Sequence, residues 1–152
     1  MSQAEILNLI KELIEKTNIS VSDISIENTW YKVEVNQPHY FIDREGEALF
    51  ALNHLVRRII ENRTPIAENL PFQNFLIDIN GFHKKRVDGL HAIAHMMAER
   101  ARYFKSSIEV DPMSSFDRRI VHEFLANEND LKTESTGFGS TRRVVIKYIG
   151  NI

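Results

Sequence analysis

Hydrophobic positions recur along this chain with two different spacings, and each spacing predicts a different kind of element. Apolar residues three or four positions apart predict helices over residues 3–16, 45–62, about 84–104 and 115 to about 127. Alternating apolar residues predict a hairpin over 23–35 that turns near residue 28, and strands over 72–79, 107–110, 131–135 and 142–149. Pro65 and Pro71 mark the segment between residues 62 and 71 as a loop.

The order of these elements predicts an α+β fold made of two small modules. The first module reads α-β-β-α-β, and the second, over residues 72–149, reads β-α-β-α-β-β. The strand at 72–79 therefore stands at the boundary and is shared by both modules. We expect two domains, over residues 1–80 and 81–152.

The distribution of charge distinguishes the two halves. The whole chain has a net charge of −2, which by itself argues against nucleic-acid binding. Residues 1–80, however, contain 7 Lys and Arg against 12 Asp and Glu, whereas residues 81–152 contain 12 against 9. The C-terminal half is therefore the one suited to an anionic ligand.

The amino-acid composition indicates the cellular compartment and excludes some classes of protein. The chain has no cysteine, which excludes disulfides and thiolate metal sites and fits a reducing cytoplasm. No apolar run is long enough to span a membrane, and the N-terminal stretch lacks the basic start of a secretory signal. We expect a cytoplasmic protein without membrane insertion.

The segment SSFDRRIVHEFL, residues 114–125, contains the most informative group of side chains. Ser114 and Asp117 have the spacing of a capping box, so a helix should begin at Ser115. On that helix Arg118 and His122 lie one turn apart at the border between the core and solvent. Four interpretations compete: a solvated polar face, a contact to phosphate, acid–base catalysis and a metal site. Catalysis and metal binding are the weakest, because no triad spacing or further ligand accompanies them.

The last predicted strand adds basic residues. In TRRVVIKY, two-residue alternation places Arg143 and Lys147 on one face and Arg142 on the other. The preceding loop, TGFGS, has two glycines that allow close approach to a phosphate. Its Phe138 either stacks on an unpaired base or folds onto its own hairpin.

These segments together carry a resemblance to a known family. Arg118-x-x-x-His122 is the signature of the R-three-H single-stranded nucleic-acid-binding domain. GFHKKRVDGLHAIAHMMAERA, SIEVDPMSSFDRRIVHEFL and STGFGSTRRVVIKY, in that order, resemble the C-terminal half of the Jag (SpoIIIJ-associated) family of bacterial RNA-binding proteins. The resemblance covers roughly residues 20–149 and implies that Arg118 and His122 form an anion-binding pair. Many Jag proteins carry an extra N-terminal domain, and we expect no role tied to it here.

The resemblance also implies a KH domain in the N-terminal half. KH domains hold nucleotides against a Gly-x-x-Gly loop that opens a helix. The matching tetrapeptide here is Asp43-Arg44-Glu45-Gly46, in which the second glycine is present and the first is replaced by aspartate. A carboxylate at that position obstructs and repels phosphate, and Arg44 compensates only in part. We expect the KH half to bind RNA weakly, in an altered way, or to use the loop for protein contacts.

Two clusters on the long helix complete the candidates. Lys84, Lys85 and Arg86 open that helix, either as a solvated triplet or as contacts to an RNA backbone. His91 and His95 have a spacing that can hold zinc, but a third ligand is not evident, so a polar helix edge is favoured. We expect no metal, no cofactor and no catalytic residue.

The sequence thus predicts a binding protein and not an enzyme. The expected function is single-stranded RNA binding, or single-stranded DNA binding, in post-transcriptional regulation, with another KH protein or a second copy as a further partner. The alternative is a protein-docking module with vestigial RNA binding. The predicted nucleic-acid-binding residues are Arg118, His122, Arg119, Arg142, Arg143, Lys147, Lys84, Lys85, Arg86, Arg44 and Gly46.

Overall fold

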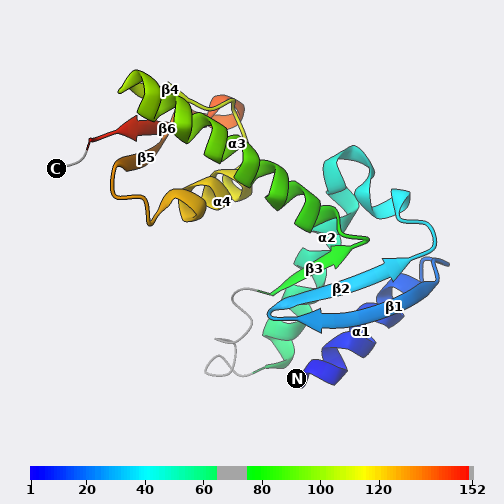
Figure 1. Cartoon of the computed structure of the whole chain (residues 1–152). Coiled ribbons are helices and arrows are strands. Elements are labelled where there is room, and N and C mark those ends of the chain that lie inside the picture. The colour runs from blue at the N-terminus through cyan, green and yellow to red at the C-terminus, as the bar shows by residue number, and fades with distance from the viewer. Residues whose placement is uncertain (65–74, 151–152) are drawn as a thin grey trace. The chain divides into compact units, whose positions relative to one another are not determined.

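The computed structural model describes residues 1–64 and 75–150 (Figure 1). The predicted loop between Pro65 and Pro71, and the start of the strand predicted at 72–79, lie outside these residues. The chain divides into two compact units, Met1–Lys84 and Lys85–Ile152, and the boundary falls in the first turn of a helix. Each unit is described by itself.

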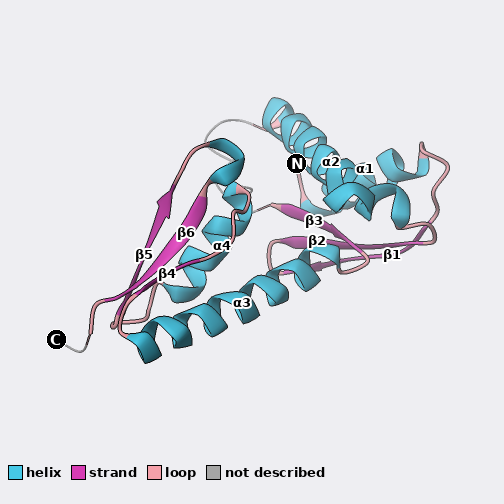
Figure 2. Ribbon diagram, turned by 90° about the horizontal axis from the view of Figure 1, so that it is seen from above, coloured by secondary structure: helices cyan, strands magenta, loops and turns pink. Residues whose placement is uncertain are grey.

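The first unit has the element order that the sequence predicts. It contains α1 (Gln3–Glu15), β1 (Val21–Glu27), β2 (Trp30–Val35), α2 (His39–Arg63) and β3 (Leu76–Ile79). The sheet order is β1-β2-β3, with β2 antiparallel to β1 and parallel to β3. Both helices lie against the same face of this sheet (Figure 2). The α+β prediction and its order of elements are confirmed for this half.

The core of the first unit forms where the apolar face of α1 packs against the apolar face of β2. Ile6, Ile10 and Ile14 recur every four residues on α1 and are fully buried. Alternate residues of β2, beginning with Tyr31 and Val33, are buried on the face toward the helices. Each fully buried side chain of this kind stabilises the fold by about 1.5–3 kcal/mol.

Helix α2 is interrupted at residues 43–46, the tetrapeptide that the sequence comparison with a KH loop predicts to be a loop. Residues 43–46 leave the helical conformation, and the φ angles of Arg44, Glu45 and Gly46 are +54°, +57° and +80°. Such left-handed angles are rare for residues other than glycine, because Cβ then crowds the carbonyl oxygen. The tetrapeptide therefore forms a sharp loop between two helical segments.

The second unit contains most of α3 (Phe82–Phe104), then β4 (Ser107–Glu109), α4 (Ser115–Leu125), β5 (Leu131–Thr136) and β6 (Arg143–Tyr148). Its sheet is antiparallel, in the order β4-β6-β5. The strand expected to be shared by both modules, β3, pairs with β2 and buries Ile77 and Ile79 in the first core. The second core is built from small residues of α3 and apolar residues of α4 and of the sheet, which include Ala94, Ala98, Val121 and Ile146.

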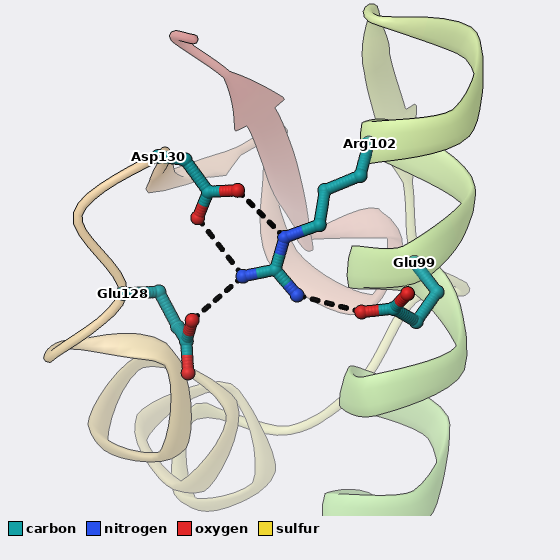
Figure 3. Close-up of polar contacts among 4 residues, drawn as sticks. All are labelled: Glu99, Arg102, Glu128 and Asp130. Atoms are coloured by element: carbon teal, nitrogen blue, oxygen red, sulfur yellow. Dashed lines mark hydrogen bonds and ion pairs between the residues drawn. The ribbon is translucent and has the colours of Figure 1, made fainter. Parts of the chain in front are cut away.

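One arginine anchors the C-terminal end of α3 within the second unit. The Arg102 guanidinium donates to both carboxylate oxygens of Asp130, at 2.7 and 2.9 Å, and to Glu128 and Glu99 at 2.6 Å each (Figure 3). Hydrogen bonds from Arg102 lower the pKa of Asp130, and the three carboxylates raise the pKa of Arg102. This network ties α3 to the segment between α4 and β5, so the position of α4 is fixed from its C-terminal side.

Candidate nucleic-acid interface

Helix α4 begins where its capping residue predicts. The Ser114 side chain accepts a hydrogen bond from the Asp117 backbone N–H at 3.2 Å, which satisfies one of the unpaired amides of the first turn. Val121 and Leu125 are buried on the inner face of the helix, and Arg119 is exposed. Arg118 and His122 lie between these faces and are half-buried.

The Arg118 guanidinium is held by one hydrogen bond from one of its nitrogens. Its Nη1 donates to the Met113 carbonyl oxygen at 2.7 Å. Within residues 1–64 and 75–150, no carboxylate forms an ion pair with this guanidinium, which carries five N–H donors. Arg118 is thus a positioned cation that retains donors for an external anion.

The His122 ring is held by two hydroxyl groups of the neighbouring strand. Its Nδ1 lies 2.7 Å from Thr133 Oγ1, and its Nε2 lies 2.8 Å from Ser135 Oγ. Burial, with Arg118 nearby as a second cause, lowers the pKa of His122 below its ordinary value of 6.5. We call Arg118, His122, Thr133 and Ser135 the Arg–His cluster.

The protonation state of His122 decides what the two hydroxyls can offer. In the neutral ring one nitrogen donates to a hydroxyl and the other accepts from one. The hydroxyl that accepts from the ring can still donate its own hydrogen to an external acceptor. The other hydroxyl already donates its hydrogen to the unprotonated ring nitrogen. A protonated ring donates from both nitrogens, so both hydroxyl protons become available to an anion.

The lowered pKa of His122 predicts how stability depends on pH. Because the folded pKa lies below the unfolded one, the unfolded chain binds more protons, and His122 contributes stability above pH 6.5 that is lost as pH falls through the folded pKa. We expect urea unfolding midpoints to fall more steeply between pH 7.5 and 5.5 for wild type than for His122→Asn. Equal slopes for the two proteins would contradict the assignment.

Arg86 forms a partly buried ion pair within the second unit. Its Nε and Nη2 donate to the two oxygens of Asp117, at 2.9 and 2.7 Å, in a bidentate pair. The Asp117 side chain is 8% exposed and that of Arg86 is 24% exposed. The pair joins the start of α3 to the first turn of α4, so the geometry gives Arg86 a structural role beside the RNA contact predicted for it.

The basic residues of β6 lie on the opposite face of the sheet from the Arg–His cluster. Ser135 and Thr133 are opposite Val144 and Ile146 in the β5–β6 register. Arg143 and Lys147 alternate with Val144 and Ile146, so their side chains emerge on the other face. They are paired there with acidic residues: Arg143 with Glu109 at 3.3 Å and Lys147 with Glu134 at 2.8 Å.

The other predicted cations are exposed at separate places. Arg119 forms an exposed ion pair with Glu123 at 2.9 Å, while Lys84 and Lys85 are exposed at the start of α3. Arg142 is exposed and follows the turn before β6, and its carbonyl oxygen accepts a hydrogen bond from the Met113 N–H at 3.1 Å. The Arg142 backbone is therefore connected to Arg118 through Met113, whose own carbonyl oxygen accepts from the Arg118 guanidinium.

In the KH-type loop, the two predicted residues have different surroundings. Arg44 is exposed, whereas Gly46 is buried. A Cβ atom added to Gly46 would lie 2.6 Å from Cε1 of Phe82. Glycine is therefore needed at this position for packing within the first unit, whatever the loop binds.

Thr133 and Ser135 were missed by the sequence interpretation. They are ordinary hydroxyl residues two positions apart on a strand, a spacing that puts them on one face. The sequence did offer one signal, because two-residue alternation puts Thr133 and Ser135 on the same face of the strand as the apolar residue Leu131. Leu131 is buried, and α4 packs on β5, so the two hydroxyls lie on the side of the sheet that α4 covers.

His91 has a packing partner. Its ring stacks on Phe124 with the centroids 4.4 Å apart and the planes at 17°. Over the described ranges 1–64 and 75–150, no three histidine or acidic side chains are grouped as metal ligands. In the same ranges there is no helix with the length and apolar character needed to cross a membrane.

Comparison with known proteins shows what these features resemble. The R-three-H domain family matches residues 89–148, which include the Arg–His cluster and all three strands of the second sheet. The chain is 29% identical over 145 residues to a protein of Bacillus subtilis (strain 168) named RNA-binding protein KhpB, a match that covers 93% of this chain and 67% of the relative. It is 24% identical over 150 residues to the protein of the same name from Clostridium symbiosum, covering 95% and 65%.

A relative of that name from Streptococcus pneumoniae serotype 2 is 23% identical, and the match covers 43% of its length. The chain thus spans about two thirds of the first two relatives and less than half of the third. Residues 89–148 match the R-three-H domain family, and the similarity of nearly the whole chain to proteins named RNA-binding protein KhpB confirms its resemblance to the Jag family.

Proposed function

We propose that this chain binds single-stranded RNA and that the Arg–His cluster holds a phosphate of the bound strand. One contrast within the second unit carries this proposal. Arg86, Arg119, Arg143 and Lys147 each form an ion pair with a carboxylate. Half-buried Arg118 has no such pair among the described residues, although it is held in place through Met113.

The chemistry of the cluster suits a phosphate group. A guanidinium presents planar donors that match two phosphate oxygens, and it remains charged at any physiological pH. A Thr133 or Ser135 hydroxyl adds a neutral donor, and the His122 ring orients both hydroxyls. Arg143 and Lys147, on the other face and already paired, contribute only long-range attraction in this proposal.

Binding accounts for the site better than catalysis does. An acid–base histidine needs a nitrogen directed at the substrate. Both nitrogens of His122 are engaged by hydroxyl groups, and its lowered pKa reflects burial and Arg118. We therefore propose a binding protein and not an enzyme.

The two units receive different roles in this proposal. Residues 81–152 act as the R-three-H domain that binds RNA, and residues 1–80 act as a KH-like domain whose degenerate loop binds it weakly. The name of the relatives, RNA-binding protein KhpB, supports RNA as the ligand. The proposal adds a cytoplasmic role in post-transcriptional regulation. Association with another KH protein or a second copy stays a prediction.

Fluorescence anisotropy of a labelled single-stranded RNA tests the proposal. We expect binding that weakens as salt rises between about 50 and 200 mM, because phosphate contacts release counterions. The same sequence as DNA measures the contribution of the ribose 2′-hydroxyl, and a duplex of it measures the preference for single strands. Absence of binding to the single strand at the lowest salt would overturn the proposal.

A further inference from the structure

The turn between β5 and β6 has a fixed backbone. Gly137 has φ +94°, and a Cβ atom there would lie 3.1 Å from the Thr141 carbonyl oxygen. The carbonyl oxygen of Phe138 accepts from the Thr141 N–H at 3.1 Å and from the Thr141 hydroxyl at 2.7 Å, and the Arg142 N–H donates to Gly139 at 3.2 Å. Hydrogen bonds therefore hold the chain on the C-terminal side of Phe138, and the left-handed conformation of Gly137 turns it on the N-terminal side.

The side chain of Phe138 is displayed on this fixed turn. It is 91% exposed, so it contributes little to the stability of the unit. A single exposed hydrophobic residue is common on protein surfaces and needs no explanation by itself. Because the backbone of the turn is already ordered, binding would have to fix only the two side-chain torsions of the ring.

Both ends of the turn are connected to the Arg–His cluster. On one side, Ser135 bonds His122 and lies two residues before Gly137. On the other side, the Arg142 carbonyl oxygen accepts from Met113, whose own carbonyl oxygen accepts from Arg118. The turn that carries the ring is thus linked to the cluster through the backbone and hydrogen bonds of the second unit.

The surroundings of the ring favour a nucleic-acid base over a protein partner. The neighbouring turn residues, Gly139, Ser140 and Thr141, are small or polar and exposed, so the turn itself adds no apolar side chain beside the ring. Arg142 is exposed and has no ion pair with a described carboxylate. An aromatic face beside unpaired cations is the arrangement with which proteins hold single strands, by stacking on bases and attracting phosphates.

We propose that Phe138 stacks on an unpaired base of the same strand whose phosphate lies on Arg118, and that Arg142 attracts the backbone next to it. This inference rests on the proposed function and adds a base-contacting site to it. Stacking tolerates any base, so the site raises affinity for single strands without selecting a sequence.

The test compares two ligands and four proteins by fluorescence anisotropy. The ligands are a labelled oligouridine of about ten nucleotides and an abasic ribose-phosphate strand of equal length. The proteins are wild type and Phe138→Ala, Phe138→Leu and Phe138→Tyr. We expect Phe138→Ala and Phe138→Leu to bind oligouridine roughly tenfold more weakly than wild type does. Phe138→Tyr should bind it with an affinity within about twofold of wild type. All four should bind the abasic strand alike, because that ligand has no base to stack.

A fluorescent variant reports the contact directly. Wild type has one tryptophan, Trp30, on the sheet of the first unit. Oligouridine should quench the fluorescence of Phe138→Trp and leave that of wild type unchanged, whereas the abasic strand should quench neither.

The outcomes separate this inference from the proposed function. If Phe138→Ala binds oligouridine as wild type does, the stacking site is overturned and RNA binding stands. If Phe138→Leu restores wild-type affinity, an apolar contact replaces stacking and the inference is again overturned. If wild type binds neither ligand at low salt, the proposed function and the stacking site fall together.

Discussion

Replacement of Arg118 by alanine is expected to weaken single-stranded RNA binding about thirtyfold, whereas replacement of its neighbour Arg119 leaves affinity within about twofold of wild type. A hydrogen-bonded contact between charged groups contributes about 2 kcal/mol, which corresponds to the larger change. Arg119 is exposed and already paired with Glu123, so its loss removes only a screened surface charge.

This pair of variants is a matched control within one helix. Both remove one arginine from α4, and the net charge of the chain changes equally. The slope of log affinity against log salt is negative, and its magnitude should be smaller by about 0.7 in Arg118→Ala if one phosphate contact is lost. Circular dichroism melts would show that α4 remains folded. Equal losses of affinity in the two variants would mean that the RNA responds to charge alone, and the phosphate site on Arg118 would be rejected.

Replacement of Asp117 by alanine is expected to destabilise the second unit by about 3 kcal/mol. The Asp117 side chain is nearly buried, and its removal leaves the Arg86 guanidinium partly buried without its bidentate partner. It also removes a negative charge from the first turn of α4, where the helix dipole favours one. Urea unfolding followed by circular dichroism measures the change.

Glu123→Ala provides the comparison for that measurement. It removes a carboxylate of the same helix from an exposed pair with Arg119, and such pairs contribute about 0–1 kcal/mol. Under conditions where the chain is folded, Arg86→Ala should change RNA affinity far less than Arg118→Ala does. A stable Asp117→Ala protein, or a large and specific loss of RNA binding in folded Arg86→Ala, would contradict the structural role of this pair.

Local patterns in the sequence were sufficient for the elements and for the position of Arg118 and His122. Helical periodicity depends on neighbours three and four residues away, so it placed both side chains at the border of α4 before any tertiary contact was known. Capping has the same local character, and α4 begins at Ser115 as predicted. The family signature at residues 118–122 added the chemical interpretation.

Strand alternation, by contrast, indicates which residues share a face but not which face meets a helix. It correctly grouped Arg143 with Lys147, yet the register of β5 and β6 places them on the face opposite the Arg–His cluster. The same register, together with the packing of α4 on β5, brought Thr133 and Ser135 to His122.

What the sequence by itself determined was the α+β class, the order of elements and the charge difference between the halves. The tertiary structure alone decided which cations are available to a ligand. Arg86 and Asp117 are 31 residues apart, and no local rule relates them, because their meeting depends on how α3 and α4 pack on one core. The availability of a charge is a property of its three-dimensional neighbours, since a carboxylate within hydrogen-bonding distance occupies the donors that a phosphate would otherwise accept from.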